Sequence, residues 1–402
     1  MKKKCFGLII DINYLQHYVH TNELLIAKIL DTFDKFYIIN ISNCKLTIFN
    51  NSFLSWDTQS FFDKNKDQIL NDLPKNFIFI NPKNINELKA FFIDKEFLLI
   101  NSIGKTFPEL NLHFLLSSKK IKQIIVSNIA NNEAEFKTSS FKAKLKVFIG
   151  KKLPSKIITL FMILGILKKF EIRFESNNKM IKFFKKQKKI TRIYNKIIPI
   201  NNRSFDNFKL SKLKITEDLI VLIDANFNHK EDVIVRGKID KKLLDLHYKK
   251  LNSLLEKLQN FYNKKVRICI HPQYDLNETK NRFLDYEIVK FKTKESIYNA
   301  SLVLFFDSTA IMDAFLLKKN IISLKTKIDW LIDTERYSKQ YGTTLIDLDS
   351  DLNFSKKELD EKLRNSKQYY DNFLNDYIIT DGDNVGVEKV ISHCQKICVN
   401  SI

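Results

Sequence analysis

Residues 266–272 read VRICIHP, and residues 302–309 read LVLFFDST. Each is a short run of β-branched, leucine or aromatic residues that ends abruptly in polar side chains, which is typical of a buried strand. After the second run the apolar spacing becomes helical over residues 310–318. Open α/β sheets bind ligands at the carboxyl ends of their strands. The two runs therefore predict a ligand site at the edge of a mostly parallel sheet.

The residues at these two strand ends suit a phosphate. His271 can donate from its ring and, when protonated, neutralises phosphate charge, while Pro272 restricts the backbone directly after it. Ser308 and Thr309 stand at a strand-to-helix turn, where hydroxyls cap free N–H groups and the helix end attracts anions. A His-Pro alone is also typical of a turn, and a Ser-Thr pair of a cap. Together the four residues predict a cradle for a nucleotide phosphate.

The remaining chain alternates strand-like and helical patterns, which favours βαβ units. Strand-like runs of the first half lie at 6–12, 36–41, 77–80, 97–100 and 121–127, and those of the second half begin at 219–224. The predicted fold class is α/β, with two Rossmann-like domains facing a cleft in a GT-B-like arrangement and mostly parallel sheets. The predicted division is an N-terminal acceptor domain at 1–150, a basic helical connector at 151–215, a nucleotide-sugar-binding domain at 216–375 and a C-terminal helix at 376–402.

The segment assigned to the connector is both basic and apolar. It contains the apolar run 157–167 and the lysine-rich aromatic run 179–189. Such a composition is typical of a helix on an anionic membrane surface. A solvated helix that joins two domains explains it equally well, so both interpretations stay open.

The charge balance favours anionic partners. Lys and Arg number 67 against 46 Asp and Glu, a net charge of +21. The abundance of Lys, Asn, Ile and Phe is typical of an AT-biased genome and explains part of this excess. The lysines are dispersed and no nucleic-acid-binding motif is present, so a non-catalytic nucleic-acid-binding protein is the less favoured hypothesis.

The cysteines and the hydropathy of the sequence indicate the cellular compartment of the protein. The five cysteines form no C-x-x-C pair, and the first apolar run is broken by Asp11 and Asn13. No apolar helical pattern approaches the roughly 20 residues that span a bilayer. The sequence therefore predicts a cytoplasmic protein, and peripheral contact with the inner face of the cytoplasmic membrane stays an open extension.

Acidic and histidine side chains near strand ends are candidates for catalysis. Asp224 ends the strand 219–224, and His229 and Asp232 follow in the next loop. Such a group can position an acceptor or transfer a proton, although Asp is also an ordinary loop residue.

The first half has an equivalent set of candidates after its first strand. Asp11, His17, His20 and Glu23 lie there, and one of them is a candidate general base. We take Asp224, His229 and Glu23 as the predicted catalytic residues.

Two α/β halves, a His-Pro after a strand of the second half, and a later Ser-Thr pair before an apolar helix resemble the GT-B glycosyltransferases of bacterial surface polysaccharide synthesis. These enzymes build capsule, O-antigen or lipooligosaccharide. The pattern is most similar to the bacterial sialyltransferase and polysialyltransferase group, whose His-Pro and paired hydroxyls hold the cytidine monophosphate of the donor. The resemblance covers residues 218–324 and implies donor binding by His271, Pro272, Ser308 and Thr309.

The resemblance also implies a reaction. It implies a metal-independent transfer, without a cofactor, from a nucleotide-sugar donor, with a CMP-sugar favoured, to a glycan or lipid-linked glycan. The acidic pair followed by Gly that supplies the base in that group is missing from the first half, and Thr380-Asp381-Gly382 lies elsewhere. An alditol-phosphate transferase of the CDP-glycerol type is the alternative enzyme class.

Overall fold

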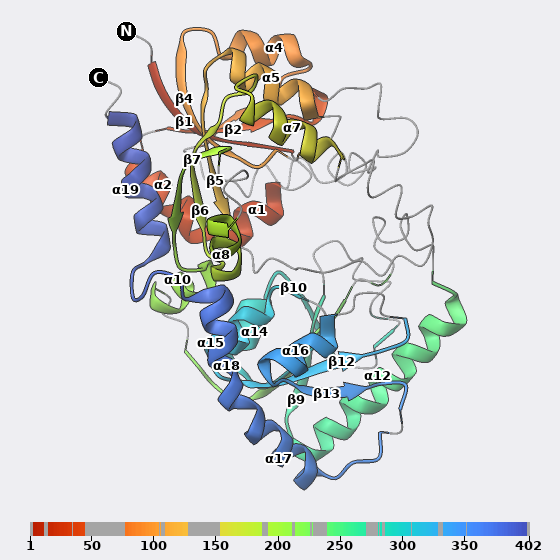
Figure 1. Cartoon of the computed structure of the whole chain (residues 1–402). Coiled ribbons are helices and arrows are strands. Elements are labelled where there is room, and N and C mark those ends of the chain that lie inside the picture. The colour runs from red at the N-terminus through yellow and green to blue at the C-terminus, as the bar shows by residue number, and fades with distance from the viewer. Residues whose placement is uncertain are drawn as a thin grey trace. The chain divides into compact units, whose positions relative to one another are not determined.

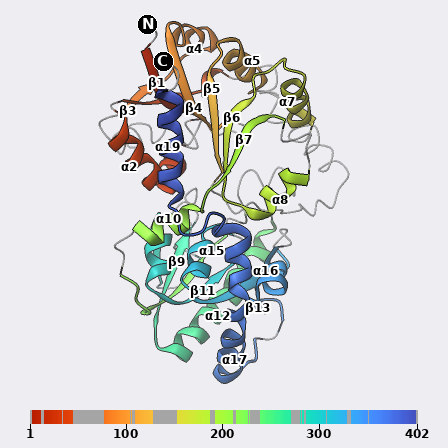
Figure 2. The ribbon, with the colours of Figure 1, turned by 60° about the vertical axis from the view of Figure 1, so that its left-hand side comes forward.

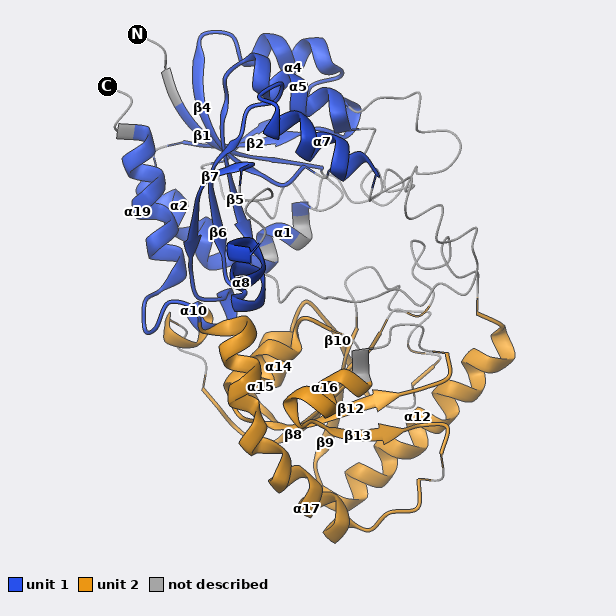
Figure 3. Ribbon diagram, in the orientation of Figure 1, with its two compact units in different colours: residues 1–128, 141–206, 380–402 blue, residues 129–140, 207–379 orange. Residues whose placement is uncertain are grey.

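The computed structural model describes residues 3–11, 15–33, 35–44, 77–103, 105, 109–127, 153–186, 192–210, 214–225, 227, 239–270, 280, 282–283, 286–306, 308–328, 333–350 and 352–399 (Figure 1). They divide into two compact units (Figure 3). Unit 1 takes the described residues of 1–128, 141–206 and 380–402, and unit 2 takes those of 207–379. The chain therefore leaves unit 1 after Asp206 and returns to it at Thr380.

Unit 1 is built on a seven-stranded parallel sheet with the order β3-β2-β1-β4-β5-β6-β7. Its strands are β1 (Lys3–Ile10), β2 (Phe36–Asn40), β3 (Phe77–Ile80), β4 (Lys95–Asn101), β5 (Lys122–Ser127), β6 (Phe170–Glu175) and β7 (Tyr194–Pro199). Its helices are α1 (Leu15–Thr21), α2 (Glu23–Thr32), the 3-10 turn η2 (Ser42–Cys44), α4 (Ile85–Phe91), α5 (Leu110–Ser118), α7 (Leu153–Ile163), α8 (Asn178–Lys186), α10 (Arg203–Leu210), which continues into unit 2, and α19 (Gly386–Val399).

Alternation along β1 explains why both faces of this sheet are covered. Phe6, Leu8 and Ile10 pack with α2 and α19, whereas Cys5 and Ile9 pack with α4 and α5. Figure 2 shows α2 and α19 apart from α4, α5 and α7. A strand buried on both faces reads as a continuous apolar run, as β1 and β2 do.

The segment 151–215 is not a separate connector in this structure. It supplies α7, β6, α8 and β7 to unit 1 and extends the first sheet by two strands. Strand β6 reads FEIRFE, in which Phe170, Ile172 and Phe174 are buried and charged residues alternate with them. The surrounding lysines hid this period-two pattern in the sequence.

Unit 2 is built on a six-stranded parallel sheet with the order β10-β9-β8-β11-β12-β13. Its strands are β8 (Leu219–Ile223), β9 (Lys265–Ile270), β10 (Glu287–Lys290), β11 (Ala300–Phe305), β12 (Asn320–Lys325) and β13 (Thr344–Asp347). Its helices are α12 (Lys241–Tyr262), α14 (Thr293–Tyr298), α15 (Ile311–Leu316), α16 (Asp333–Tyr341), α17 (Lys356–Ser366), the 3-10 turn η6 (Lys367–Tyr369), α18 (Tyr370–Phe373) and the π-helical turn η7 (Leu374–Ile378).

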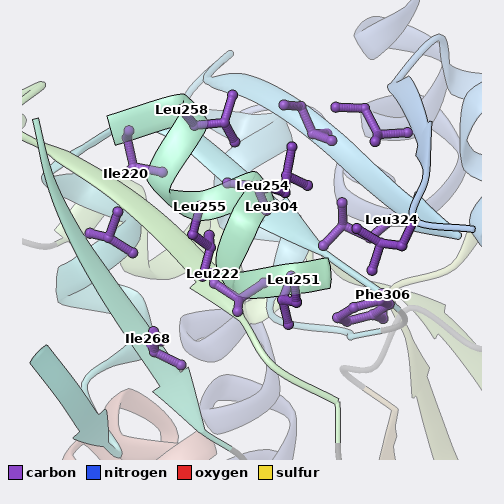
Figure 4. Close-up of a cluster of buried hydrophobic side chains, with 14 of the residues drawn as sticks. Ile220, Leu222, Leu251, Leu254, Leu255, Leu258, Ile268, Leu304, Phe306 and Leu324 are labelled. Atoms are coloured by element: carbon purple, nitrogen blue, oxygen red, sulfur yellow. The ribbon is translucent and has the colours of Figure 1, made fainter. Parts of the chain in front are cut away.

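The long helix α12 covers one face of this second sheet. Its buried Leu251, Leu254, Leu255 and Leu258 pack against strand residues that include Ile220, Leu222, Ile268 and Leu304 (Figure 4). Burying a leucine side chain of this kind contributes about 1.5–3 kcal/mol. Helix α12 therefore packs against β8, β9 and β11 through an apolar face.

The architecture of each unit agrees with the predicted Rossmann-like organisation. Among the described residues no helix is both long and apolar enough to cross a membrane. The described cysteines form no disulfide.

Candidate functional site

The order of the strands in unit 2 singles out one position on its sheet. From β8 the chain proceeds to β9 and β10 on one side, and then returns to β11 on the other side of β8. The direction of winding thus reverses between β8 and β11. Open α/β sheets bind ligands outside the carboxyl ends of the strands at such a reversal.

Two groups of predicted site residues follow these two strands. Asp224 follows β8, and Ser308 and Thr309 follow β11 after Phe306. The two strands are paired in parallel, with Phe305 opposite Ile223. The structure therefore brings Asp224 and the hydroxyl pair to neighbouring strand ends at the reversal point.

Ser308 organises the turn that leads into α15. Its hydroxyl oxygen accepts a 3.3 Å hydrogen bond from the backbone N–H of Ala310, and its carbonyl accepts one of 3.2 Å from Ile311. The carbonyl of Thr309 accepts a 3.3 Å hydrogen bond from the N–H of Met312. Ser308 and Thr309 are both partly exposed.

Asp224 lies deeper, with 4% of its surface exposed. Burial raises the pKa of its carboxyl group to about 7, and the charge of Arg282, the backbone of Ala225 and the hydroxyl of Tyr248 oppose this shift only in part. The guanidinium carbon of Arg282 lies 5.3 Å from the centre of the Tyr248 ring. Asp224 is thus a buried acid that lies next to an arginine and a tyrosine.

Asn252 of α12 holds the two neighbours of Asp224 in place. Its side-chain amide donates to the carbonyl of Tyr248 at 2.9 Å and to that of Arg282 at 2.8 Å. The backbone at Arg282 is therefore tied to α12, although these residues lie 30 positions apart in the sequence.

His247 of α12 is also buried. Its Nδ1 atom is 3.3 Å from the hydroxyl of Thr326, the residue after β12. Its ring packs against Phe227 at 4.9 Å and Phe306 at 5.4 Å. Burial lowers the pKa of His247 to about 4, so the ring is neutral at physiological pH.

His247, Tyr248 and Arg282 are not among the residues predicted from the sequence. A usable signal for the first two was present, because both fall on the face of α12 that is otherwise formed by buried leucines. Polar side chains on such a face are either satisfied core residues or parts of a site. Arg282 carries no comparable local signal.

Three of the predicted site residues, His271, Pro272 and His229, lie outside the described residues, as does Asp232. The described part of the chain ends β9 at Ile270, directly before His271. Strand β9 adjoins β8 on the side away from β11, so one strand separates the ends of β9 and β11. At a strand spacing of about 4.8 Å, these ends are roughly 10 Å apart, a span that a nucleotide can bridge.

Unit 1 has its own reversal point between β1 and β4. Asp11 follows β1 there and is buried, and the Ser42 hydroxyl lies 2.9 Å from its carboxylate. The same hydroxyl lies 2.8 Å from the side-chain oxygen of Asn40, whose amide donates to Asn81 at 2.7 Å. A chain of polar side chains therefore runs along the ends of β1, β2 and β3.

Unlike Asp11, the predicted base Glu23 does not directly follow a strand. It is exposed and begins α2, so the whole of α1 separates it from the end of β1. His17 and His20 belong to α1, and the positions of their side chains are outside the described set. Of the four first-half candidates, the structure places Asp11 directly at the strand edge.

Comparison with known proteins supports the fold. No protein-family model and no curated protein matches the chain. A solved variant of the wall teichoic acid polymerase TagF matches with a TM-score of 0.57 at 9% identity, covering 100% of this chain and 90% of that chain. UDP-GlcNAc 2-epimerase from Methanocaldococcus jannaschii matches with a TM-score of 0.51 at 13% identity, covering 98% and 99% of the two chains.

A putative UDP-N-acetylglucosamine 2-epimerase from Listeria monocytogenes is similar at a TM-score of 0.50, with 12% identity and coverage of 100% of this chain and 97% of that chain. At such low identities these likenesses show the fold alone. They confirm the predicted fold class, two α/β domains with parallel Rossmann-like sheets of the GT-B type.

Proposed function

We propose that the chain is a glycosyltransferase that moves a sugar from a nucleotide-sugar donor to a surface glycan acceptor without a metal ion. The observation that supports this most strongly is the pairing of β8 with β11, which sets Asp224 beside Ser308 and Thr309 at the reversal point of the second sheet. The solved structures with the same fold include a UDP-GlcNAc 2-epimerase and the wall teichoic acid polymerase TagF.

In this proposal the hydroxyls of Ser308 and Thr309 hold the donor phosphate, and His271 and Pro272 complete the cradle from the end of β9. An acceptor oxygen attacks the anomeric carbon while the bond from that carbon to the nucleotide phosphate breaks. The leaving nucleotide carries the new negative charge, which hydrogen-bond donors and an imidazolium stabilise. The favoured donor is a CMP-sugar.

The acceptor proton must pass to a base, for which Asp224, His229 and Glu23 are the proposed candidates. Asp11, another of the first-half candidates, is buried at the end of β1 and is a further candidate. Asp224 is buried, and burial raises its pKa to about 7, which suits a group that takes up a proton near neutral pH. A lipid-linked glycan at the inner face of the cytoplasmic membrane is the proposed acceptor.

A second candidate is transfer of an alditol phosphate from a CDP-linked donor. The likeness to the wall teichoic acid polymerase, which spans this whole chain, favours it. In this reaction the acceptor oxygen attacks phosphorus instead of carbon, and CMP leaves. The same phosphate cradle would serve both reactions.

Product mass separates the two candidates. The protein is incubated with CMP-sugars, UDP-sugars or CDP-glycerol, each with a lipid-linked glycan and a chelator, and released nucleotide and product mass are followed. Glycosyl transfer adds the mass of a sugar residue, whereas alditol-phosphate transfer adds a phosphodiester. Nucleotide release that is unchanged in His271→Ala would remove His271 from the site, and no release from any donor would refute both candidates.

A further inference from the structure

Large apolar side chains gather on the surface of unit 1 where α7 ends. Leu160 is 50% exposed, Leu164 62% and Ile166 52%, and Phe114 of the neighbouring α5 is 40% exposed. We call these four residues the α7 tip. Exposed apolar residues scattered singly are ordinary, but a group of this kind marks a surface that binds something.

The backbone fixes the position of the α7 tip. The N–H of Ile166 donates to the carbonyl of Phe161 at 2.9 Å, and the N–H of Gly165 donates to that of Met162 at 3.3 Å. Gly165 has φ +77°, so this is a Schellman motif that ends the helix. In such a motif the residue after the glycine commonly packs back on the helix. Here Ile166 remains 52% exposed, and Leu164 before the glycine is 62% exposed.

Helix α5 supports the tip from the side. The rings of Phe114 and Phe161 lie 5.9 Å apart. The backbone N–H of Lys168 donates to the Ser117 hydroxyl at 2.8 Å, and its ammonium group donates to the carbonyl of Lys120 at 3.2 Å. The segment that carries the apolar side chains is therefore fixed to α5 by these contacts.

Several basic residues lie near the tip in the sequence or through contacts. Lys156 is exposed and lies one helical turn before Leu160. Lys168 and Lys169 follow Ile166 closely, and Lys120 is brought beside them by its contact with Lys168. Glu171 is the acid nearest in sequence to Lys168, and the two form an ion pair at 3.4 Å.

We propose that the α7 tip docks unit 1 on an anionic lipid bilayer. Its aliphatic and aromatic side chains would enter the acyl boundary, and the surrounding lysines would lie at the lipid phosphates, which their long stems can reach. Lysines close to a small apolar group match the charge of such a surface, as does the net charge of +21. Four side chains are too small a group for a stable protein interface, which buries about 800 Å² on each partner.

This inference does not depend on the proposed enzymatic reaction. If the proposed function is correct, the same contact would bring the enzyme to a lipid-linked acceptor. Vesicle binding is measured without nucleotide or acceptor, so failure of the transferase assignment leaves the result unaffected.

The test is co-sedimentation with vesicles of phosphatidylcholine, with and without phosphatidylglycerol. The full chain should bind the anionic vesicles and lose binding as salt is raised. The double variant Leu164→Ser/Ile166→Ser should bind roughly tenfold more weakly, because it removes most of the inserted apolar area. Lys120→Gln/Lys169→Gln should weaken binding to anionic vesicles and flatten its salt dependence.

A matched control is Ile215→Ser, which removes a side chain of unit 2 that is 51% exposed and should bind like the parent chain. Unchanged binding by the Leu164/Ile166 variant, or no binding by the parent chain, would overturn the proposal. If the same variant instead abolished self-association in sedimentation velocity without affecting vesicle binding, the tip would be a contact between copies of this chain, and the membrane assignment would be rejected.

Discussion

Asp206 accepts a 2.7 Å hydrogen bond from the backbone N–H of Gly386, a residue 180 positions further along the chain. Its second carboxylate oxygen accepts from Val387 at 2.8 Å, so one side chain caps the start of α19. Asp206 is the last residue of unit 1 before the chain enters unit 2, and α19 begins soon after the chain returns. These hydrogen bonds therefore join the last residue before unit 2 to the helix that follows unit 2, and both belong to unit 1.

Gly386→Ala should destabilise unit 1. A Cβ atom at this position would lie 2.7 Å from the carbonyl oxygen of Asn201 and 3.2 Å from the carboxylate of Asp206. The backbone would have to move, at a cost of about 1–3 kcal/mol. The free energy of unfolding from urea denaturation measures the effect, and the exposed Lys396→Ala on the same helix should differ little from the parent chain. Equal stability of the two variants would show that α19 is not held this closely.

Asp224→Asn should change how stability depends on pH. The folded-state pKa of Asp224 is raised from 3.8 to about 7, so its contribution is fully present below pH 3.8 and is lost as the pH rises through about 7. Asparagine does not ionise, so the variant should gain stability relative to the parent across this range, by up to about 4 kcal/mol at 1.4 kcal/mol for each pKa unit.

Urea denaturation at several pH values follows this difference. Asp245→Asn is the control, since Asp245 is exposed on α12. A constant difference between parent and Asp224→Asn at all pH values would mean that Asp224 titrates normally.

Local sequence patterns are sufficient to predict the helix and the strands that border the site. The bounds of α12, Lys241–Tyr262, follow from the local sequence, because the residues that cap both of its ends lie directly beside it. The side chain of Asp240 accepts the N–H groups of Lys242 and Leu243, and Asn263 adopts φ 50° to end the helix. Likewise, the apolar runs before Asp224 and Ser308 were enough to predict β8 and β11.

The neighbours of these residues could not be predicted in the same way. Arg282 reaches Tyr248, and His247 reaches Thr326, through contacts between segments that are distant in sequence. Such contacts depend on the strand order, which the chain does not encode locally. Glu23 was selected by its closeness in sequence to β1, and the intervening α1 is what separates it from the strand end.

Ser308→Ala should raise the KM for the donor more than it lowers kcat. The substitution removes a phosphate ligand under the proposed function and also the 3.3 Å cap on Ala310, so the turn into α15 loosens. Loss of one hydrogen bond to a charged phosphate corresponds to about 1.5–3 kcal/mol, or roughly ten- to hundredfold. Initial rates at varied donor concentrations provide the measurement.

Ser301→Ala is the matched control for this kinetic prediction. Ser301 lies near the other end of the same strand, and its hydroxyl donates to the carbonyl of Leu219 at 3.1 Å. Its loss should leave the KM unchanged. If Ser301→Ala and Ser308→Ala alter the KM equally, the effect of Ser308 is structural.

Glu175→Ala should destabilise unit 1 strongly. Glu175 is 1% exposed, and one of its oxygens accepts from Arg173 at 2.6 Å and 2.8 Å. Burial raises the pKa of Glu175, but the charge of Arg173 opposes this. Removing the carboxylate would leave the guanidinium buried without its counter-charge, which costs about 3–5 kcal/mol.

The comparison with Glu171→Ala isolates the buried pair. Glu171 lies on the same strand, but its ion pair with Lys168 at 3.4 Å is partly exposed and contributes at most about 1 kcal/mol. Because Arg173 also donates to the Tyr194 hydroxyl at 3.0 Å, Tyr194→Phe should cost less than Glu175→Ala. Urea denaturation of the three variants should therefore rank Glu175→Ala as the least stable. If Glu171→Ala is equally unstable, the stability of strand β6 depends on its more exposed charges and not on the buried pair.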